Sequence, residues 1–285
     1  MAYNGAFVFN NVSNGDYELT ITYLGTGRYL KKISVDNNIE LSIALTQDPL
    51  SLNNVVVTGS FEPRMQLQSS TAITTLTSKD LKQVFPRGTA DLLQNVPGTF
   101  VDASAGEVFT RVYTRGISAS AEDDMGWYYT SLQEDGLPVS LIQHSYYSPD
   151  IFFRNDLTTQ KVEALRGGKA AITSLNAPGG IYNFISKTGS EEFEGELQVH
   201  GGMQGDDNSL YRIDGVFGGS LGNDLFYSIG GHYRNDDGAR NTDFTFNHGG
   251  QLKFNLIKKT ENGYFKFYGK YLDDYTNRYT GVAAT

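Results

Sequence analysis

The chain has 285 residues, enough for one large domain or two ordinary ones, and its 23 basic against 32 acidic residues give a formal charge of −9. This acidic balance argues against a general nucleic-acid binder, which needs a basic face, and the lack of cysteine excludes disulfides, cysteine zinc sites and thiol nucleophiles. The 32 glycines, 18 tyrosines and 17 phenylalanines with only 7 prolines indicate a β-rich chain with tight turns. No apolar run is longer than Ala6–Phe9, so we predict neither a transmembrane helix nor a cleavable signal peptide.

Residues 1–47 have the pattern of short strands. After the turn signal Ser13–Asp16, apolar residues recur at every second position from Tyr17 to Tyr23, and Ile39–Leu45 alternate in the same way. Strands separated by polar turns predict part of a small β-sandwich. Because the chain begins inside a strand-like run, we expect the first strands of this module to be missing.

Residues 48–65 have the composition of a linker. They contain the strongly β-prone run Val55–Gly59, which has no obvious partner strand. One interpretation is a short edge strand of the first domain. The other is a segment that pairs with the sheet edge of a second protein. The residues alone favour the edge strand.

Residues 66–189 are predicted to be mixed α/β. Ser78 can cap one helix that ends before Pro86, and Thr89 can cap a second that ends at Pro97-Gly98. A third, short helix is expected at residues 169–173. Strand-like runs lie at residues 99–102, 110–114, 131–134, 162–165 and 181–185.

Residues 190–285 contain five strands of roughly ten residues joined by hairpin turns, the length that a tilted strand needs to cross a bilayer. Each strand places apolar residues on one face and polar residues on the other. That pattern fits a membrane barrel and also a soluble sandwich, but strands in soluble sheets are usually shorter. Five strands cannot close a membrane barrel, so the membrane interpretation makes this chain a fragment.

Five motifs in residues 66–189 resemble, in the same order, those of the plug domain of TonB-dependent outer-membrane receptors. They are Asp91–Gly98, Arg111–Gly116, Glu134–Val139, Val162–Gly167 and Pro178–Lys187. Residues 1–47 are similar to the carboxypeptidase-regulatory-like module that precedes some of these receptors. The resemblance implies a mixed architecture: an incomplete sandwich-like module, an α+β plug, and the start of an antiparallel transmembrane barrel of 22 strands.

The resemblance also implies a function. The run Val55–Gly59 takes the position of the TonB box, which adds as a strand to the periplasmic protein TonB; its members here are Val55, Val56, Val57, Thr58 and Gly59. The expected function is TonB-dependent uptake of a scarce nutrient across the outer membrane. The expected partners are TonB, outer-membrane lipid and a small extracellular ligand bound by plug apex and barrel loops, without nucleic acid.

Two groups of plug residues are candidates for function. Arg115, Asp135, Glu163 and Arg166 can form a charge network that responds to traction, or only ordinary salt bridges. Two aromatic loops are candidates for ligand contact, or can instead pack against the barrel wall. Their residues are Asp123, Asp124, Trp127, Tyr128 and Tyr129 in the first loop, and Tyr146 and Tyr147 in the second.

No pattern in the chain predicts catalysis or a cofactor. The four histidines have no metal-binding spacing, and the chain lacks a Gly-x-Ser-x-Gly elbow and a phosphate-binding glycine loop. We therefore expect no enzyme activity, no metal and no cofactor. The alternative to a transporter is a secreted or surface β-rich module that binds glycans.

Overall fold

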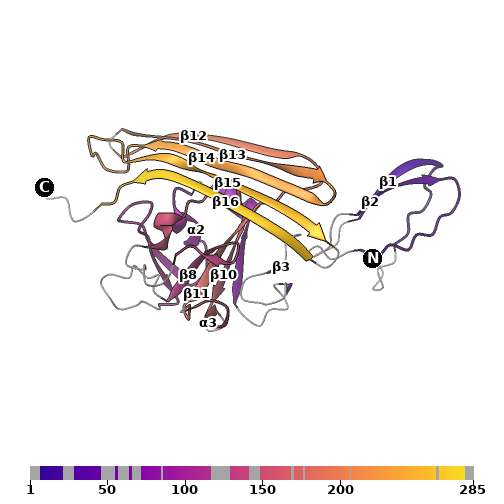
Figure 1. The fold of residues 1–285 in the computed structure, drawn as a ribbon, viewed down its shortest axis with the longest axis horizontal. Coiled ribbons are helices and arrows are strands. Elements are labelled where there is room, and N and C mark those ends of the chain that lie inside the picture. The colour runs from indigo at the N-terminus through magenta and orange to yellow at the C-terminus, as the bar shows by residue number, and fades with distance from the viewer. Residues whose placement is uncertain are drawn as a thin grey trace. The chain divides into compact units, whose positions relative to one another are not determined.

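The computed structural model describes residues 7–21, 29–45, 55–56, 64–65, 72–84, 86–116, 129–140, 148–167, 170–175, 177–205, 207–260 and 263–279. The chain divides into two compact units, Met1–Ser69 and Ser70–Thr285 (Figure 1). None of the helices in the described ranges has the length and apolar character that a membrane-spanning helix requires.

The described residues of the first unit form two short antiparallel pairs of strands. Strand β1 (Gly15–Ile21) pairs with β2 (Tyr29–Val35), with Tyr17 opposite Ile33. Strand β3 (Val55–Val56) pairs with β4 (Arg64–Met65). The prediction of a strand at Ile39–Leu45 is wrong. Apolar residues alternate there, but the segment pairs with no strand among the described residues.

The second unit begins with an α/β domain, residues 72–187, built on a five-stranded sheet. The sheet order is β5-β10-β11-β8-β9, and β11 runs parallel to β8 while its other pairs are antiparallel. Among the described residues, a separate pair of strands, β6 with β7, and four short helices complete the domain. The strands are β5 (Ile73–Thr77), β6 (Thr99–Asp102), β7 (Arg111–Thr114), β8 (Thr130–Glu134), β9 (Leu137–Pro138), β10 (Thr159–Arg166) and β11 (Gly180–Ser186), and the helices are α1 (Ser78–Gln83), α2 (Thr89–Leu93), η3 (Pro149–Phe152) and α3 (Ala170–Thr173).

The two predicted helices α1 and α2 are present, and each is capped one residue earlier than the sequence suggested. Thr77, not Ser78, is the N-cap of α1, and its backbone N–H donates to the Asp80 carboxylate at 2.8 Å. Gly88, not Thr89, is the N-cap of α2. In both helices an acidic side chain at the third helical position accepts a hydrogen bond from the N-cap backbone N–H, which has no partner within the helix.

One face of the α/β sheet carries the apolar core of the domain. Val162 and Ala164 of β10 lie beside Tyr182 and Phe184 of β11, and Leu92 of α2 packs in the same cluster. All five residues are at most 2% exposed. The alternation of β10 places Lys161 and Glu163 on the opposite face of the sheet, where both are also buried.

Five long antiparallel strands follow and form what we call the wall sheet. They pair consecutively and have 11 to 15 residues each, which confirms the predicted long strands (Figure 1). Two-residue turns such as Asn223-Asp224, in which both residues have positive φ, fit the hairpins that the turn signals predicted. The strands are β12 (Glu194–Gln204), β13 (Asn208–Gly222), β14 (Leu225–Asp236), β15 (Asn247–Thr260) and β16 (Gly263–Thr276).

The two faces of the wall sheet are the reverse of those in a soluble sheet. The buried face is polar, with Arg212, Asp214, Gln251 and Lys253 each at most 7% exposed. The opposite face is exposed and apolar; its side chains include Leu197, Val199, Ile213, Phe217, Ile229, Leu252, Phe265 and Phe267. A sheet that exposes its apolar side chains and covers its polar ones fits a bilayer on one side and a polar interior on the other.

Candidate functional site

The contact between the α/β domain and the wall sheet is made of paired charges. Glu134, at the end of β8, lies 2.7 Å from the ammonium of Lys253 and also pairs with Lys270. The hydroxyl of Tyr268 donates to the same carboxylate at 3.2 Å. Burial alone would raise the pKa of the Glu134 carboxyl, but the charges of Lys253 and Lys270 outweigh it and hold the pKa below its usual value.

A second group of charges surrounds Asp274 of β16. Its carboxylate accepts hydrogen bonds from Arg154 of the α/β domain and from Arg234 of β14, the latter at 2.7 Å. Arg234 also pairs with Glu107, so one carboxylate from each side is joined to the same guanidinium. The Arg154 guanidinium donates as well to the carbonyl oxygen of Phe153, at 2.8 Å. These bonds satisfy the charges that burial removes from water.

The loop that carries Arg154 is held by two buried carboxylates. Asp150 accepts the backbone N–H of Phe109 and of Thr110, both at 3.1 Å, and so joins this loop to the segment that carries Glu107. Burial raises the pKa of the Asp150 carboxyl. Asp156 accepts the Thr158 backbone N–H at 2.8 Å and the side-chain amide of Gln251 from the wall sheet.

Histidine and arginine side chains of the wall sheet approach the same loop. Nδ1 of His232 lies 3.5 Å from the Asp156 carboxylate, and Arg212 donates to the carbonyl oxygen of Asn155 at 2.6 Å. Burial raises the pKa of Asp156, yet the positive charge of Lys253 and the side chains of His232 and Thr158 lower it overall. The described contacts of this interface are therefore mainly ion pairs and hydrogen bonds between buried groups.

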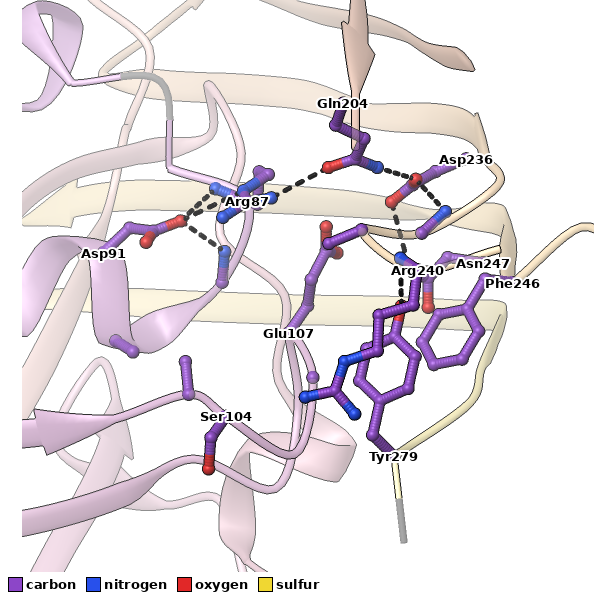
Figure 2. A pocket seen from close by; sticks show the side chains of 16 residues that line it. Arg87, Asp91, Ser104, Glu107, Gln204, Asp236, Arg240, Phe246, Asn247 and Tyr279 are labelled. Atoms are coloured by element: carbon purple, nitrogen blue, oxygen red, sulfur yellow. Dashed lines mark hydrogen bonds and ion pairs between the residues drawn. The ribbon is translucent and has the colours of Figure 1, made fainter. Parts of the chain in front are cut away.

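A pocket of about 230 Å³ opens at one end of this interface, and we call it the rim pocket (Figure 2). Arg87, Asp91 and Glu107 line it from the α/β domain. Asn247 and Tyr279 are among the residues that line it from the ends of the wall strands. Burial raises the pKa of the Glu107 carboxyl to about 7, because the charge of Arg234 only partly offsets it and the carboxylate of Asp236 adds to it.

The four residues of the predicted charge network lie at different places. Arg115 and Arg166 are neighbours, and burial together with the charge of Arg115 lowers the pKa of Arg166. Arg166 donates to Thr74 Oγ1 at 2.7 Å and to the Pro97 carbonyl oxygen. Asp135 lies at the opposite end of β11, where it accepts the Ser186 backbone N–H at 3.0 Å and pairs with Lys266 of the wall sheet at 2.9 Å. The two arginines are therefore apart from Asp135.

Glu163 is also separate from the arginines. It pairs with Lys161 at 2.6 Å on the face of β10 opposite to Arg166. A regulatory role for any of these four residues stays a prediction.

Most of the predicted binding residues lie outside the described part of the chain. Of the TonB-box residues only Val55 and Val56 are described, as strand β3, while Val57, Thr58 and Gly59 are not. Of the ligand candidates only Tyr129 is described, in the turn just before β8, where its carbonyl oxygen accepts the Gly179 N–H at 2.8 Å. Asp123, Asp124, Trp127, Tyr128, Tyr146 and Tyr147 lie outside the described residues.

Sequence reasoning missed the residues that join the two parts of the second unit. Glu107, Arg154 and Asp156 carry no motif, and their partners on the wall sheet are far away in sequence. One signal was available: charged residues at alternate positions of β13 to β15 indicate a face that meets polar groups. Among the described residues no group of three or more histidines or carboxylates is placed to hold a metal ion.

An α/β domain seated on the polar face of long strands, whose other face is apolar and exposed, is the arrangement of a plugged membrane barrel. The family model described as the TonB-dependent Receptor Plug Domain matches residues 66–181. Residues 66–181 therefore belong to the family of TonB-dependent receptor plug domains, and the α/β domain is this plug.

Solved receptor structures have the same fold. The pyoverdine outer membrane receptor FpvA from Pseudomonas aeruginosa PAO1 is 19% identical, with a TM-score of 0.58 over 76% of this chain and 29% of the receptor. The ferric citrate transporter FecA is 15% identical, with a TM-score of 0.56 over 71% and 31%. The siderophore receptor PirA from Pseudomonas aeruginosa is 20% identical, with a TM-score of 0.51 over 71% and 36%. The match thus spans about a third of the length of these receptors.

Proposed function

We propose that the complete receptor takes up a scarce small nutrient across the outer membrane by TonB-dependent active transport. The proposal includes the division into a regulatory-like module (1–47), a linker with the TonB box (48–65), the plug (66–189) and barrel strands (190–285). Receptors of this family transport and do not catalyse. A secreted glycan-binding module does not account for the exposed apolar face of the wall sheet.

The observation that carries the proposal is the polar contact between plug and wall sheet. Buried ion pairs contribute little net stability, because the cost of removing them from water offsets their attraction. When such an interface opens and water enters, its charges regain hydration, whereas an apolar interface loses its whole driving force. A plug held by Glu134, Arg154 and Asp156 can therefore shift without the plug itself unfolding.

The loops of the wall sheet give its orientation in this proposal. Outer-membrane barrels have short periplasmic turns and longer extracellular loops. The connection of residues 237–246 is long, and the turn Asn223-Asp224 at the other end is short. The rim pocket lies at the end with the long connection, so we place it at the extracellular side, where a ligand arrives.

The test begins with the TonB box in the complete receptor. Val56→Pro removes a backbone donor from the run that is proposed to pair with TonB, and strand addition depends on such donors. We expect binding of the purified periplasmic domain of TonB, measured by surface plasmon resonance, to fall at least tenfold. Ser51→Pro, in the same linker but outside the run, is the control. Equal binding by both variants and wild type would reject this role for Val55–Gly59.

Uptake itself needs a ligand to follow. The solved structures with this fold are named as siderophore or ferric citrate receptors, which supports a radiolabelled ferric siderophore as the first ligand to test. Uptake by cells that contain TonB, and none by cells that lack it, is the expected result. Uptake that continues without TonB would contradict active transport.

A further inference from the structure

The rim pocket contains two polar groups that lack a charged or hydrogen-bonding partner among the described residues. The pocket draws residues from the plug and from the wall strands, so a ligand part held there touches both bodies at once (Figure 2). Its volume of about 230 Å³ is below the roughly 300–1,000 Å³ that encloses a drug-sized ligand. It therefore suits one small polar group of a ligand. This inference rests on the proposed function as a ligand receptor.

The first unused group is the guanidinium of Arg240. It lies 4.4 Å from the ring centroid of Tyr279, and the Arg240 backbone N–H donates to the Tyr279 hydroxyl at 3.2 Å. Phe246 stacks on the same tyrosine with ring centroids 4.4 Å apart, and the Tyr279 backbone N–H donates to the Ala105 carbonyl oxygen of the plug at 2.7 Å. In Figure 2 the guanidinium lies along this ring and points into the pocket.

Arg240 has no ion-pair partner in the described part of the chain. By contrast, Arg87 in the same pocket donates to Gln204 at 2.9 Å and lies near Asp91. A guanidinium that is fixed by stacking and still has its donors available is suited to a carboxylate, which it can bind with two parallel hydrogen bonds.

The second unused group is the side-chain oxygen of Asn247. This residue is 1% exposed, and its Nδ2 donates to the Asp236 carboxylate at 2.9 Å, which fixes the orientation of the amide. Its Oδ1 has no hydrogen-bond partner among the described residues. A buried acceptor without a donor is costly, so a ligand N–H that reaches it replaces a missing bond. Glu107, which is already paired with Arg234, lines the same pocket.

We propose that the rim pocket binds an amino-carboxylate group, such as the unblocked termini of a short zwitterionic peptide. The carboxylate binds the Arg240 guanidinium, and the ammonium donates to Asn247 Oδ1 beside Glu107. The Asp236 carboxylate is not an anchor, because it already accepts from Gln204, Gly238 and Asn247. The selectivity of this site is for groups that carry both charges, since a ligand with one charge leaves one of the two anchors unpaired.

The test uses the complete receptor in detergent and the dipeptide L-alanyl-L-alanine as the probe. Its N-acetylated and C-amidated derivatives each remove one charge. We expect isothermal titration calorimetry to show that each derivative binds at least tenfold more weakly than the free dipeptide. Arg240→Gln is expected to weaken the free dipeptide by roughly 10- to 100-fold, which corresponds to one charged hydrogen-bonded contact, and to abolish the preference over the C-amide.

Three further variants separate recognition from misfolding. Arg240→Lys keeps the charge without the fork and is expected to bind with intermediate affinity. Asn247→Leu is expected to lose the preference over the N-acetyl derivative. Arg278→Gln removes a guanidinium that stacks on Phe109 at 5.1 Å outside the pocket, and is expected to bind like wild type. Equal binding of all three dipeptides, no binding of any, or equal losses in R240Q and R278Q would overturn the proposal.

Failure of this inference is distinct from failure of the proposed function. Binding of the dipeptide does not require TonB, whereas uptake does. Uptake that depends on TonB but ignores Arg240 would reject the amino-carboxylate site and leave the transporter intact. Suppose instead that dipeptide binding depends on Arg240 but the Val56→Pro variant still binds TonB. That result would keep the amino-carboxylate site and reject the TonB-box assignment.

Discussion

The interior of the plug and its contact with the wall sheet are built from different chemistry. Inside the plug, Leu92, Val162, Tyr182 and Phe184 form a closed apolar cluster. At the wall sheet the contacts are ion pairs and hydrogen bonds to carbonyl oxygens, such as that of Glu134 with Lys253. Both regions are buried, but only the first gains stability from leaving water.

This difference assigns separate tasks to the two regions. A fully buried large apolar side chain contributes about 1.5–3 kcal/mol, so the core keeps the plug folded as one body. The interface fixes the position of the plug on the wall sheet, because its ion pairs form in only one arrangement of the two. When the plug shifts, water can hydrate the separated charges. The predictions below test whether the two regions can be disturbed independently.

The largest effect is expected in the core. Phe184 is 2% exposed, and its ring lies 4.4 Å from that of Phe153. Phe184→Ala leaves a cavity and is expected to lower the free energy of unfolding of the plug by about 3–5 kcal/mol. Urea unfolding of the complete receptor, followed by protease sensitivity of the plug, measures it. Phe100→Ala, at a residue 64% exposed in this structure, is the control and should change the value by less than about 0.5 kcal/mol.

The sequence predicted most of the strands and helices, but few of the contacts between the plug and the wall sheet. Alternation identified the five wall strands, and local capping signals located α1 and α2 to within one residue. The alternation of apolar residues at Ile39–Leu45 predicted a strand that does not form. A strand needs a hydrogen-bonded neighbour, and the sequence pattern does not show whether one is present.

The interface depends on partners that are distant in sequence. Lys270 reaches Glu134 across 136 residues, and Arg234 reaches Glu107 across 127. No spacing rule links such pairs, since only the packing of the plug on the strands brings them together. The sequence identified the plug by its motifs, whereas the rim pocket depended on the orientation of Arg240 and Asn247, which no motif encodes.

A smaller effect is expected at the interface. Glu134→Gln removes the carboxylate that Lys253 and Lys270 share and is expected to weaken the hold of the wall sheet on the plug by roughly 1.5–3 kcal/mol. Hydrogen exchange should become faster at residues 130–138 and stay unchanged at the backbone of the core strand β10. Exposed Glu192→Gln is the matched control. If E134Q and F184A lower the same unfolding transition together, the two regions are not independent.

The smallest expected effect is a dependence of interface stability on pH. The contributions of two interface carboxyls, Glu134 and Glu107, change in opposite directions as the pH rises. The pKa of Glu134 is lowered, so the stability from its ionised form is present above the usual carboxyl pKa and is lost as pH falls through the lowered value. The pKa of Glu107 is raised from 4.5 to about 7, so the stability from its protonated form is fully present below pH 4.5 and is lost as pH rises through about 7.

The rim end of the plug is therefore expected to loosen as pH rises from about 5 to 8, by about 1–2 kcal/mol, while the contact at Glu134 does not. Hydrogen exchange at residues 103–108, compared with residues 130–138 at both pH values, measures this. Glu107→Gln cannot ionise and should remove the difference at the rim, and exposed Glu194→Gln should leave it in place. Loosening of both ends together would mean that the plug moves as one rigid body, and that Glu107 reports this motion without controlling it.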